Sequence, residues 1–297
     1  SQGVHLVLDC KFLPGDSAIM VPHTDDGRVL FVIPWHGRVL VGTTDTALEK
    51  PDLEPRALDE EIAFILRNAA RYLVRDPSRG DVLAVFAGQR PLVRPPGADG
   101  TPTKKISRNH EVLVSESGLV TLVGGKWTTY RKMAQDAVDV VVQLGGFRER
   151  PCVTGKLPLH GWRSADAVPL PDELQAYGAD ARHLEQLMIE HPELAVPLHP
   201  GLSYLRASVV WAVREEMART VEDVLARRTR ALLLDARAAA AAAPETARLL
   251  AAELNRNENW QAEQISAFQT LADGYLPSRE NDLTGSEGMK CSRDGGD

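Results

Sequence analysis

One short stretch joins two regular hydrophobic patterns: Gly124-Gly125-Lys126-Trp127-Thr128-Thr129-Tyr130-Arg131. The apolar run at 119–123 before it predicts a buried β-strand. After it, apolar residues recur with the spacing of an amphipathic helix, namely Tyr130, Met133, Ala134, Ala137, Val138 and Val141. The stretch is therefore predicted to be a glycine turn between a strand and the N-terminus of a helix.

Such a turn suits an anion or an electron-rich ring. Two glycines let the backbone approach a ligand closely, because neither has a Cβ atom. The first turn of a helix leaves amide N–H groups unpaired and carries roughly half a positive charge. Lys126 adds a full charge there, and Thr128 adds a hydroxyl. A tight turn with a solvated lysine explains the same residues about equally well, since short glycine turns are common.

The composition is that of an ordinary globular protein of about two domains. The chain has 297 residues, of which 43% are hydrophobic and 25% charged. Its net charge of −7 argues against a nucleic-acid partner. Cys10, Cys152 and Cys291 are scattered, which gives no metal spacing and no disulfide framework and is typical of a reducing compartment. We therefore expect no metal site.

Upstream of the glycine turn the sequence predicts an antiparallel sheet. Strands are expected at 4–8, 17–21, 29–33 and 38–42, with two turn signals between them that mark hairpins. A helix at 58–69, a buried strand at 82–87 and a hairpin at 112–123 follow. The polar segment Thr43-Thr44-Asp45-Thr46, at the end of a strand, either lines a pocket or begins a loop.

Downstream of Gly145-Gly146 the strand signals vanish. Residues 147–171 are rich in proline and glycine, and helical periodicity follows them. Pro244 fits the first position of a new helix after an alanine-rich one. The sequence thus predicts a helical domain at 147–276 and, from its polar composition, a disordered tail at 277–297.

Five polar residues at predicted strand ends or turns are candidates for chemistry: His5, Arg90, Arg108, His110 and Lys126. Each of them alone is more often a surface residue or a satisfied partner in a hydrogen-bond network. These residues indicate an α/β part with a candidate anion pocket, followed by a helical domain, but they do not define a reaction.

Six segments follow one another along the chain at residues 31–35, 41–45, 87–92, 107–110, 124–131 and 213–230. Together they resemble the second half of FAD-dependent glycerol-3-phosphate dehydrogenase, in a match that runs from about residue 1 to 276. The resemblance implies an α/β plus all-α fold. Residues 1–146 would form an antiparallel substrate-binding sheet with the last strand and helix of an FAD-binding domain, and 147–276 the C-terminal helical domain.

The chain departs from this family in one respect. Members begin with a strand-turn-helix of the Gly-x-Gly-x-x-Gly kind, which holds the FAD pyrophosphate at a helix N-terminus. No such motif occurs in these 297 residues. We therefore expect the chain to be a fragment or a truncated product that begins inside the substrate-binding part, and whose activity alone is an open question.

The resemblance implies oxidation of sn-glycerol 3-phosphate to dihydroxyacetone phosphate, with hydride transfer from C2 to FAD and electrons passed to a membrane quinone. It implies His5 and Arg90 as catalytic residues. The implied substrate contacts are Arg90, Arg108 and Thr128, and the implied flavin contacts are Gly124, Gly125, Lys126, Trp127 and Thr128. Which of these residues handles the C2 hydroxyl and which the phosphate stays open.

The same resemblance implies a cytoplasmic protein, peripheral on the inner face of the cell membrane, and a homodimer. Two other interpretations stay open. A glycerol-3-phosphate oxidase shares these motifs but passes its electrons to oxygen. A fragment of this kind is also compatible with a non-catalytic role in binding or assembly.

Overall fold

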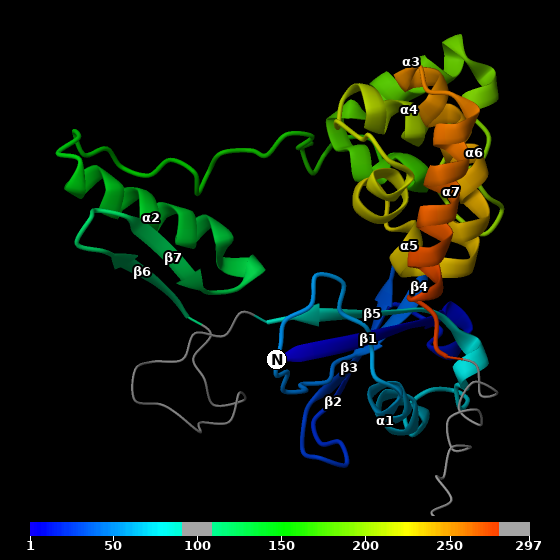
Figure 1. The fold of residues 1–297 in the computed structure, drawn as a ribbon, viewed down its shortest axis with the longest axis horizontal. Coiled ribbons are helices and arrows are strands. Elements are labelled where there is room, and N and C mark those ends of the chain that lie inside the picture. Colours follow the sequence, from blue (N-terminus) through cyan, green and yellow to red (C-terminus); the bar gives the residue numbers. More distant parts are fainter. Residues whose placement is uncertain (91–108, 279–297) are drawn as a thin grey trace, which may run out of the picture. The chain divides into compact units, whose positions relative to one another are not determined.

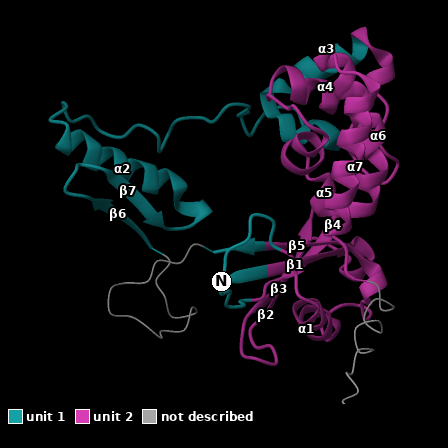
Figure 2. Cartoon of the chain, in the orientation of Figure 1, with its two compact units in different colours: residues 1–3, 45–55, 88–189 teal, residues 4–44, 56–87, 190–297 magenta. Residues whose placement is uncertain are grey.

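The structure, a computed structural model, describes residues 1–90 and 109–278. The chain forms two compact units that interleave along the sequence (Figure 2). The first unit contains Ser1–Gly3, Asp45–Pro55 and Gly88–Ile189, and the second contains Val4–Thr44, Arg56–Ala87 and Glu190–Asp297. The domain boundaries predicted from the sequence stay a prediction. All but the first two residues of the predicted tail lie outside the described residues, and so does Arg108.

A five-stranded sheet, in the order β2-β3-β4-β1-β5, lies mainly in the second unit (Figure 1). Its strands are β1 (Gln2–Asp9), β2 (Ile19–Val21), β3 (Leu30–Trp35), β4 (Arg38–Gly42) and β5 (Val82–Gln89). Strands β2, β3, β4 and β1 pair antiparallel in turn. The antiparallel sheet predicted from the hairpin signals is therefore confirmed.

The sheet packs against helix α1 (Asp59–Ala70) to form a hydrophobic core. The apolar residues Ile62 and Ile65 of α1 are 2% and 0% exposed, and they belong to the same hydrophobic cluster as Val4 and Leu6 of β1. Three acidic residues occupy the first turn of α1, where the helix dipole favours negative charge. The apolar spacing and the acidic N-terminal residues that predicted this helix therefore agree with the structure. The helix covers one face of the sheet.

The helical part of the second unit follows later in the chain. It contains α4 (Arg206–Arg214), α5 (Ala231–Leu234), α6 (Ala236–Leu254), α7 (Glu258–Asp273), the 3-10 turn η6 (Pro192–Leu194) and the π-helical segment η7 (Asp223–Arg228). Two hydrogen bonds tie it to β5: Arg237 Nη1 donates to the Val82 carbonyl at 2.9 Å, and Val85 N donates to the Tyr275 carbonyl at 2.7 Å. The predicted helical C-terminal region is confirmed, although Pro244 lies inside α6 instead of beginning a new helix.

The first unit holds a hairpin and a long helix, β6 (His110–Val114), β7 (Val120–Gly124) and α2 (Tyr130–Leu144), and later η5 (Asp172–Asp180) and most of α3 (Ala181–Glu190). The short 3-10 segments η1 (Cys10–Phe12), η2 (Arg79–Asp81) and η4 (Trp127–Thr129) complete the elements of the described chain.

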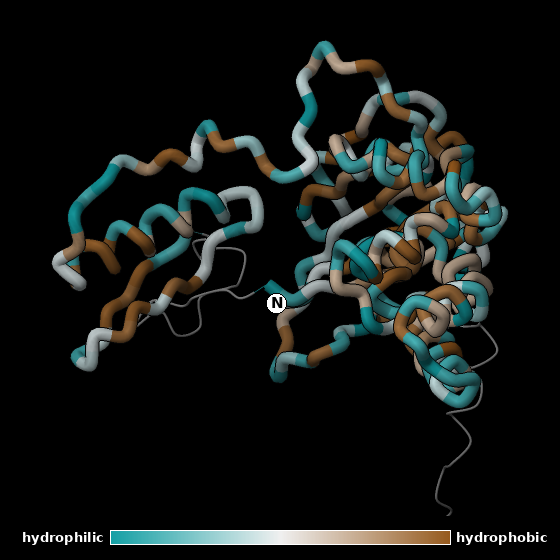
Figure 3. Tube along the Cα trace, turned by 90° about the horizontal axis from the view of Figure 1, so that it is seen from above, coloured by the Kyte–Doolittle hydropathy of each residue, from teal (hydrophilic) through white to brown (hydrophobic). Residues whose placement is uncertain are grey.

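The prediction that β7 is buried is wrong. The strand forms, but Leu122 is 37% exposed, and no residue of α2 is buried. Apolar segments of the hairpin appear in brown in Figure 3. A two-stranded ribbon with one helix offers too little area to enclose a core, and nothing in the described part of the first unit encloses these side chains.

Candidate functional site

The glycine turn has the conformation that its sequence predicts. Gly124 and Gly125 have φ values of 72° and 80°, a left-handed conformation that residues with a Cβ atom rarely adopt. A Cβ atom on Gly125 would lie 2.4 Å from Met133 Sδ and 3.2 Å from His110 Cβ. The turn therefore lies tightly between β6 and the first turns of α2, and only glycine fits there.

The helix start beyond the turn is open to a ligand. Lys126 stands at the cap position of the 3-10 segment η4, where its backbone N–H donates to Thr129 Oγ1 at 3.3 Å. The exposed residues Lys126, Trp127 and Thr128 follow one another there. The Trp127 side chain is 86% exposed and stacks on Tyr130, with ring centroids 5.4 Å apart. Amide groups, a lysine and an accessible aromatic ring thus lie together at one helix N-terminus, an arrangement that suits an anion or an electron-rich ring.

His110 has a partner within the first unit. Its Nε2 atom lies 2.8 Å from Asp136 Oδ2, which links β6 to α2, and Lys132 forms an ion pair with the same carboxylate. The hydrogen bonds from Lys132 and His110 lower the pKa of Asp136. This arrangement matches the interpretation of His110 as a satisfied partner in a hydrogen-bond network.

Arg90 is held by two other segments of the first unit. Arg90 Nη1 donates to Asp45 Oδ1 at 3.0 Å and to the Gln2 carbonyl at 3.2 Å. Its backbone N–H donates to the Ser1 carbonyl at 2.7 Å. The side chains of Arg90 and Asp45 are 23% and 16% exposed. Sequence reasoning did not name Asp45 as a site residue, although it lies in the polar segment at a strand end and in the resembling segment 41–45.

His5 lies on β1, in the second unit, directly opposite Gly42 of β4. Its ring stacks on Phe86 with centroids 5.5 Å apart. A Cβ atom on Gly42 would lie 2.3 Å from His5 Cδ2, so the glycine makes room for the imidazole. The structure thus explains why a histidine is accommodated in an otherwise apolar strand.

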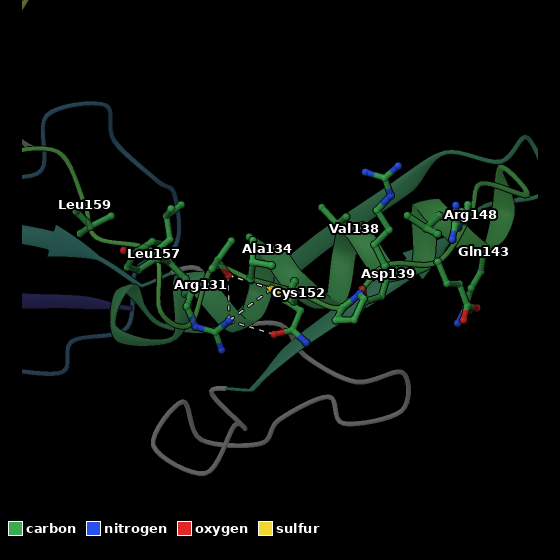
Figure 4. A pocket seen from close by; sticks show the side chains of 17 residues that line it. Arg131, Ala134, Val138, Asp139, Gln143, Arg148, Cys152, Leu157 and Leu159 are labelled. Carbon is green, nitrogen blue, oxygen red and sulfur yellow. Dashed lines mark hydrogen bonds between the residues drawn. The ribbon is translucent and has the colours of Figure 1, made fainter.

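A groove of about 1190 Å³ runs along α2 in the first unit, and its lining includes Tyr130, on which Trp127 stacks (Figure 4). Arg131 crosses it and donates to Gln135 Oε1 at 3.1 Å and to Thr154 Oγ1 at 3.2 Å. The hydrogen bond between Cys152 and Thr154 lowers the pKa of the Cys152 thiol, and the charge of Arg131 acts in the same direction. These contacts fasten the irregular segment after α2 to the helix.

The predicted site residues fall into three groups. Arg90 lies with Asp45 and Gln2 in the first unit, and Gly124, Gly125, Lys126, Trp127 and Thr128 form the glycine turn and helix start of the same unit. His5 belongs to the second unit, and Arg108 lies outside the described residues. Among residues 1–90 and 109–278, no three metal-ligating side chains converge.

Comparison with known proteins defines the class of this chain. Residues 1–131 match the family described as FAD dependent oxidoreductase, and residues 117–264 match the C-terminal domain of alpha-glycerophosphate oxidase. By class, the chain thus resembles FAD-dependent oxidoreductases. The relatives that match most of its length are named glycerol-3-phosphate dehydrogenases, and the chain resembles that family.

The chain is 38% identical to a probable mitochondrial glycerol-3-phosphate dehydrogenase of Caenorhabditis elegans, over 92% of this chain and 40% of the relative. It is 35% identical to the human mitochondrial glycerol-3-phosphate dehydrogenase, over 96% of this chain and 42% of the relative. The structure of glycerol-3-phosphate dehydrogenase from Bacillus halodurans complexed with FAD superposes with a TM-score of 0.74 at 28% identity, over 93% of this chain and 57% of that one. The chain therefore spans less than half the length of the two mitochondrial relatives, and somewhat more than half of the Bacillus halodurans protein.

Proposed function

We propose that the protein to which this chain belongs oxidises sn-glycerol 3-phosphate to dihydroxyacetone phosphate. The observation that carries the proposal is the glycine turn at an open helix N-terminus, in a chain whose relatives are named glycerol-3-phosphate dehydrogenases. FAD, when bound, supplies the acceptor for the hydride that leaves C2 of the substrate. The residues of this chain bind, orient and exchange protons around that transfer.

The turn and helix start would hold the pyrimidine edge of the flavin. Gly124 and Gly125 allow close approach, and the first-turn amides with Lys126 stabilise the negative charge that develops there on reduction. Trp127 and Thr128 complete the contact. The proposal is supported by their exposure, since all three side chains after Gly125 are accessible at the helix start.

Arg90, Arg108 and His5 would serve the substrate. A guanidinium suits bidentate recognition of a phosphate or a charge-assisted hydrogen bond to the C2 oxygen. A histidine suits removal of the C2 hydroxyl proton, because its unperturbed pKa of about 6.5 lies near the operating pH. Thr128 is a further substrate contact in this proposal.

We further propose that a dinucleotide-binding part beyond these 297 residues completes the FAD site. The sequence has no Gly-x-Gly-x-x-Gly motif, and the curated relatives are more than twice as long as the stretch that matches. The apolar face of α2 supports the proposal, because Val138, Val141 and Leu144 are 58%, 44% and 56% exposed. Side chains with helical periodicity and this exposure are expected to pack against further protein.

The electron acceptor proposed for the complete protein is a membrane quinone. No helix in the described part of the chain has the length and apolar character to cross a membrane. As the family resemblance implies, we propose peripheral contact with the cytoplasmic face of the membrane. We also propose a homodimer, because two-fold dimers are the commonest assembly. The second candidate acceptor is oxygen, which the match to the alpha-glycerophosphate oxidase domain favours.

The test uses the full-length protein loaded with FAD. Under anaerobic conditions, sn-glycerol 3-phosphate should bleach the flavin absorbance, and a quinone analogue should restore it. Rapid recovery with oxygen and stoichiometric hydrogen peroxide would instead identify an oxidase. A flavin that keeps its colour with sn-glycerol 3-phosphate would contradict the proposed substrate.

A further inference from the structure

We infer that Asp45 is a positioning residue for Arg90, which it holds in the orientation that receives the substrate. The inference rests on the proposed role of Arg90 in substrate binding. It gives a function to the polar segment 43–46, which nothing in the proposed reaction otherwise uses.

The contact between the two side chains is short and shielded. Arg90 Nη1 and Asp45 Oδ1 are 3.0 Å apart, and the same nitrogen donates to the Gln2 carbonyl at 3.2 Å. With exposed fractions of 23% and 16%, the pair is more shielded from solvent than the pairs of Arg67 and Arg71 with Asp25, in which the arginines are 56% and 53% exposed. Charge-assisted hydrogen bonds are stronger in such surroundings than at the surface.

The backbone on both sides of this contact is fixed independently of the arginine side chain. Gln2 N donates to the Thr46 carbonyl at 2.7 Å, and Thr46 N donates to the Gln2 carbonyl at 2.9 Å. Arg90 N donates to the Ser1 carbonyl at 2.7 Å. Three chain segments are thus joined through main-chain atoms, so a change of the Asp45 side chain alone leaves their pairing in place.

An arginine side chain that is fixed before the substrate arrives is correctly oriented at a low cost in conformational entropy. The free side chain has many rotamers, and ordering them on substrate binding costs free energy. A carboxylate that already fixes the guanidinium removes much of that cost, and a misplacement of about 1 Å can lower a rate by about a hundredfold. Asp45 does this without touching the substrate itself.

The inference is tested in the full-length, FAD-loaded protein with the variants Asp45→Asn, Arg90→Gln and the double variant. Asp45→Asn keeps the shape and removes the charge, and it should lower kcat/KM for sn-glycerol 3-phosphate about tenfold. The loss should appear in the same parameter, kcat or KM, that Arg90→Lys changes. In the Arg90→Gln background, Asp45→Asn should cause no further loss.

A second readout does not depend on turnover. The Kd of dihydroxyacetone phosphate for the oxidised protein, measured by calorimetry, should rise in Asp45→Asn by a factor similar to that in Arg90→Lys. Asp25→Asn is the matched control, because it removes a carboxylate that also pairs with arginines, on a surface of the second unit. It should leave kcat/KM unchanged.

The outcomes separate the inference from the proposal beneath it. Normal kcat/KM in Arg90→Gln would remove Arg90 from the site and would refute the proposed role of that arginine. An impaired Arg90→Gln with a normal Asp45→Asn would overturn the inference alone, and so would an additive loss in the double variant. If Asp45→Asn does not fold, Asp45→Glu, which shifts the carboxylate by one methylene, should show an intermediate loss, and a wild-type value would overturn the inference.

Discussion

Helices α1 and α2 have similar sequence patterns and opposite surroundings. Ile62 and Ile65 of α1 are 2% and 0% exposed, whereas Val138 and Val141 of α2 are 58% and 44% exposed. Each helix follows the apolar periodicity of an amphipathic helix, and each packs near antiparallel strands. The pattern therefore identifies the side chains that are expected to be covered, but not the protein that covers them.

The largest effect expected from this difference concerns the cofactor. The 297-residue chain, expressed alone, should not retain FAD after purification, because it lacks a pyrophosphate-binding motif and leaves the apolar face of α2 open. Absorbance spectra of the purified protein, before and after incubation with FAD and gel filtration, measure the retained flavin. A yellow protein with one FAD per chain would show that the cofactor needs no further segment.

The second prediction compares one side chain from each helix. Ile65→Ala should lower the free energy of unfolding by roughly 2–5 kcal/mol, since it opens a cavity in the core. Val138→Ala should change the free energy of unfolding by less than about 0.5 kcal/mol. Truncation of an exposed valine removes little packing, and alanine has the higher helix propensity. Urea denaturation of the 297-residue chain measures both values. Equal losses would mean that another surface, such as a second copy, covers α2 in solution.

The third prediction concerns Arg90, which belongs to the first unit, as α2 does. Unlike the exposed residues of α2, its side chain is fixed by hydrogen bonds to Asp45 and to the Gln2 carbonyl. Arg90→Gln removes a charge-assisted hydrogen bond worth roughly 1.5–3 kcal/mol. In the full-length protein kcat/KM should therefore fall about 10- to 150-fold, and Arg90→Lys should recover only part of the loss.

The substrate analogue glycerol distinguishes the two roles of Arg90. If the arginine binds the phosphate, wild type and Arg90→Gln should use glycerol about equally badly. If it serves the C2 oxygen, both substrates should suffer by a similar factor. Wild-type kcat/KM with intact flavin would exclude Arg90 from the site.

The glycine turn and the sheet could be predicted from sequence because their signals are local. A strand, two glycines and a helical period fix the path of the chain at Gly124 and Gly125, and hairpin signals fix neighbouring strands. The exposure of β7 and the contact between Asp45 and Arg90 could not be predicted, since both depend on segments distant in sequence. The same holds for Gly42, whose lack of a side chain makes room for His5 on the neighbouring strand.

Pro244 shows how tertiary packing overrides a local signal. Proline usually begins a helix because it lacks an N–H group. Here α6 continues through it, and Ala239, Ala243 and Ala247 are 0% exposed on either side. The packing of this alanine face outweighs one lost hydrogen bond, and a sequence pattern does not report that balance.

The smallest effect expected is a difference in acid sensitivity between carboxylates of the two units. Burial raises the pKa of Asp223, but hydrogen bonds from Arg219 N, Arg227 and Thr220 outweigh it and lower this pKa from 3.8 to about 2. A lowered pKa in the folded state adds stability above pH 3.8, which is lost as the pH falls toward 2. Because Asp223 is partly exposed, we expect a contribution of about 1–2 kcal/mol.

Asp223→Asn tests this contribution, with Asp136→Asn of the first unit as its counterpart. Unfolding free energies measured between about pH 6 and pH 2.5 should show a loss in Asp223→Asn that shrinks as the acid protonates the wild-type carboxylate. The pKa of Asp136 is also lowered, by the hydrogen bonds from Lys132 and His110. Substitution of Asp136 should matter less, because this residue belongs to α2, a helix with no buried residue, whose unfolding costs little free energy. A larger loss in Asp136→Asn than in Asp223→Asn would mean that α2 unfolds together with the core, and that α1 and α2 do not differ in the way their exposure indicates.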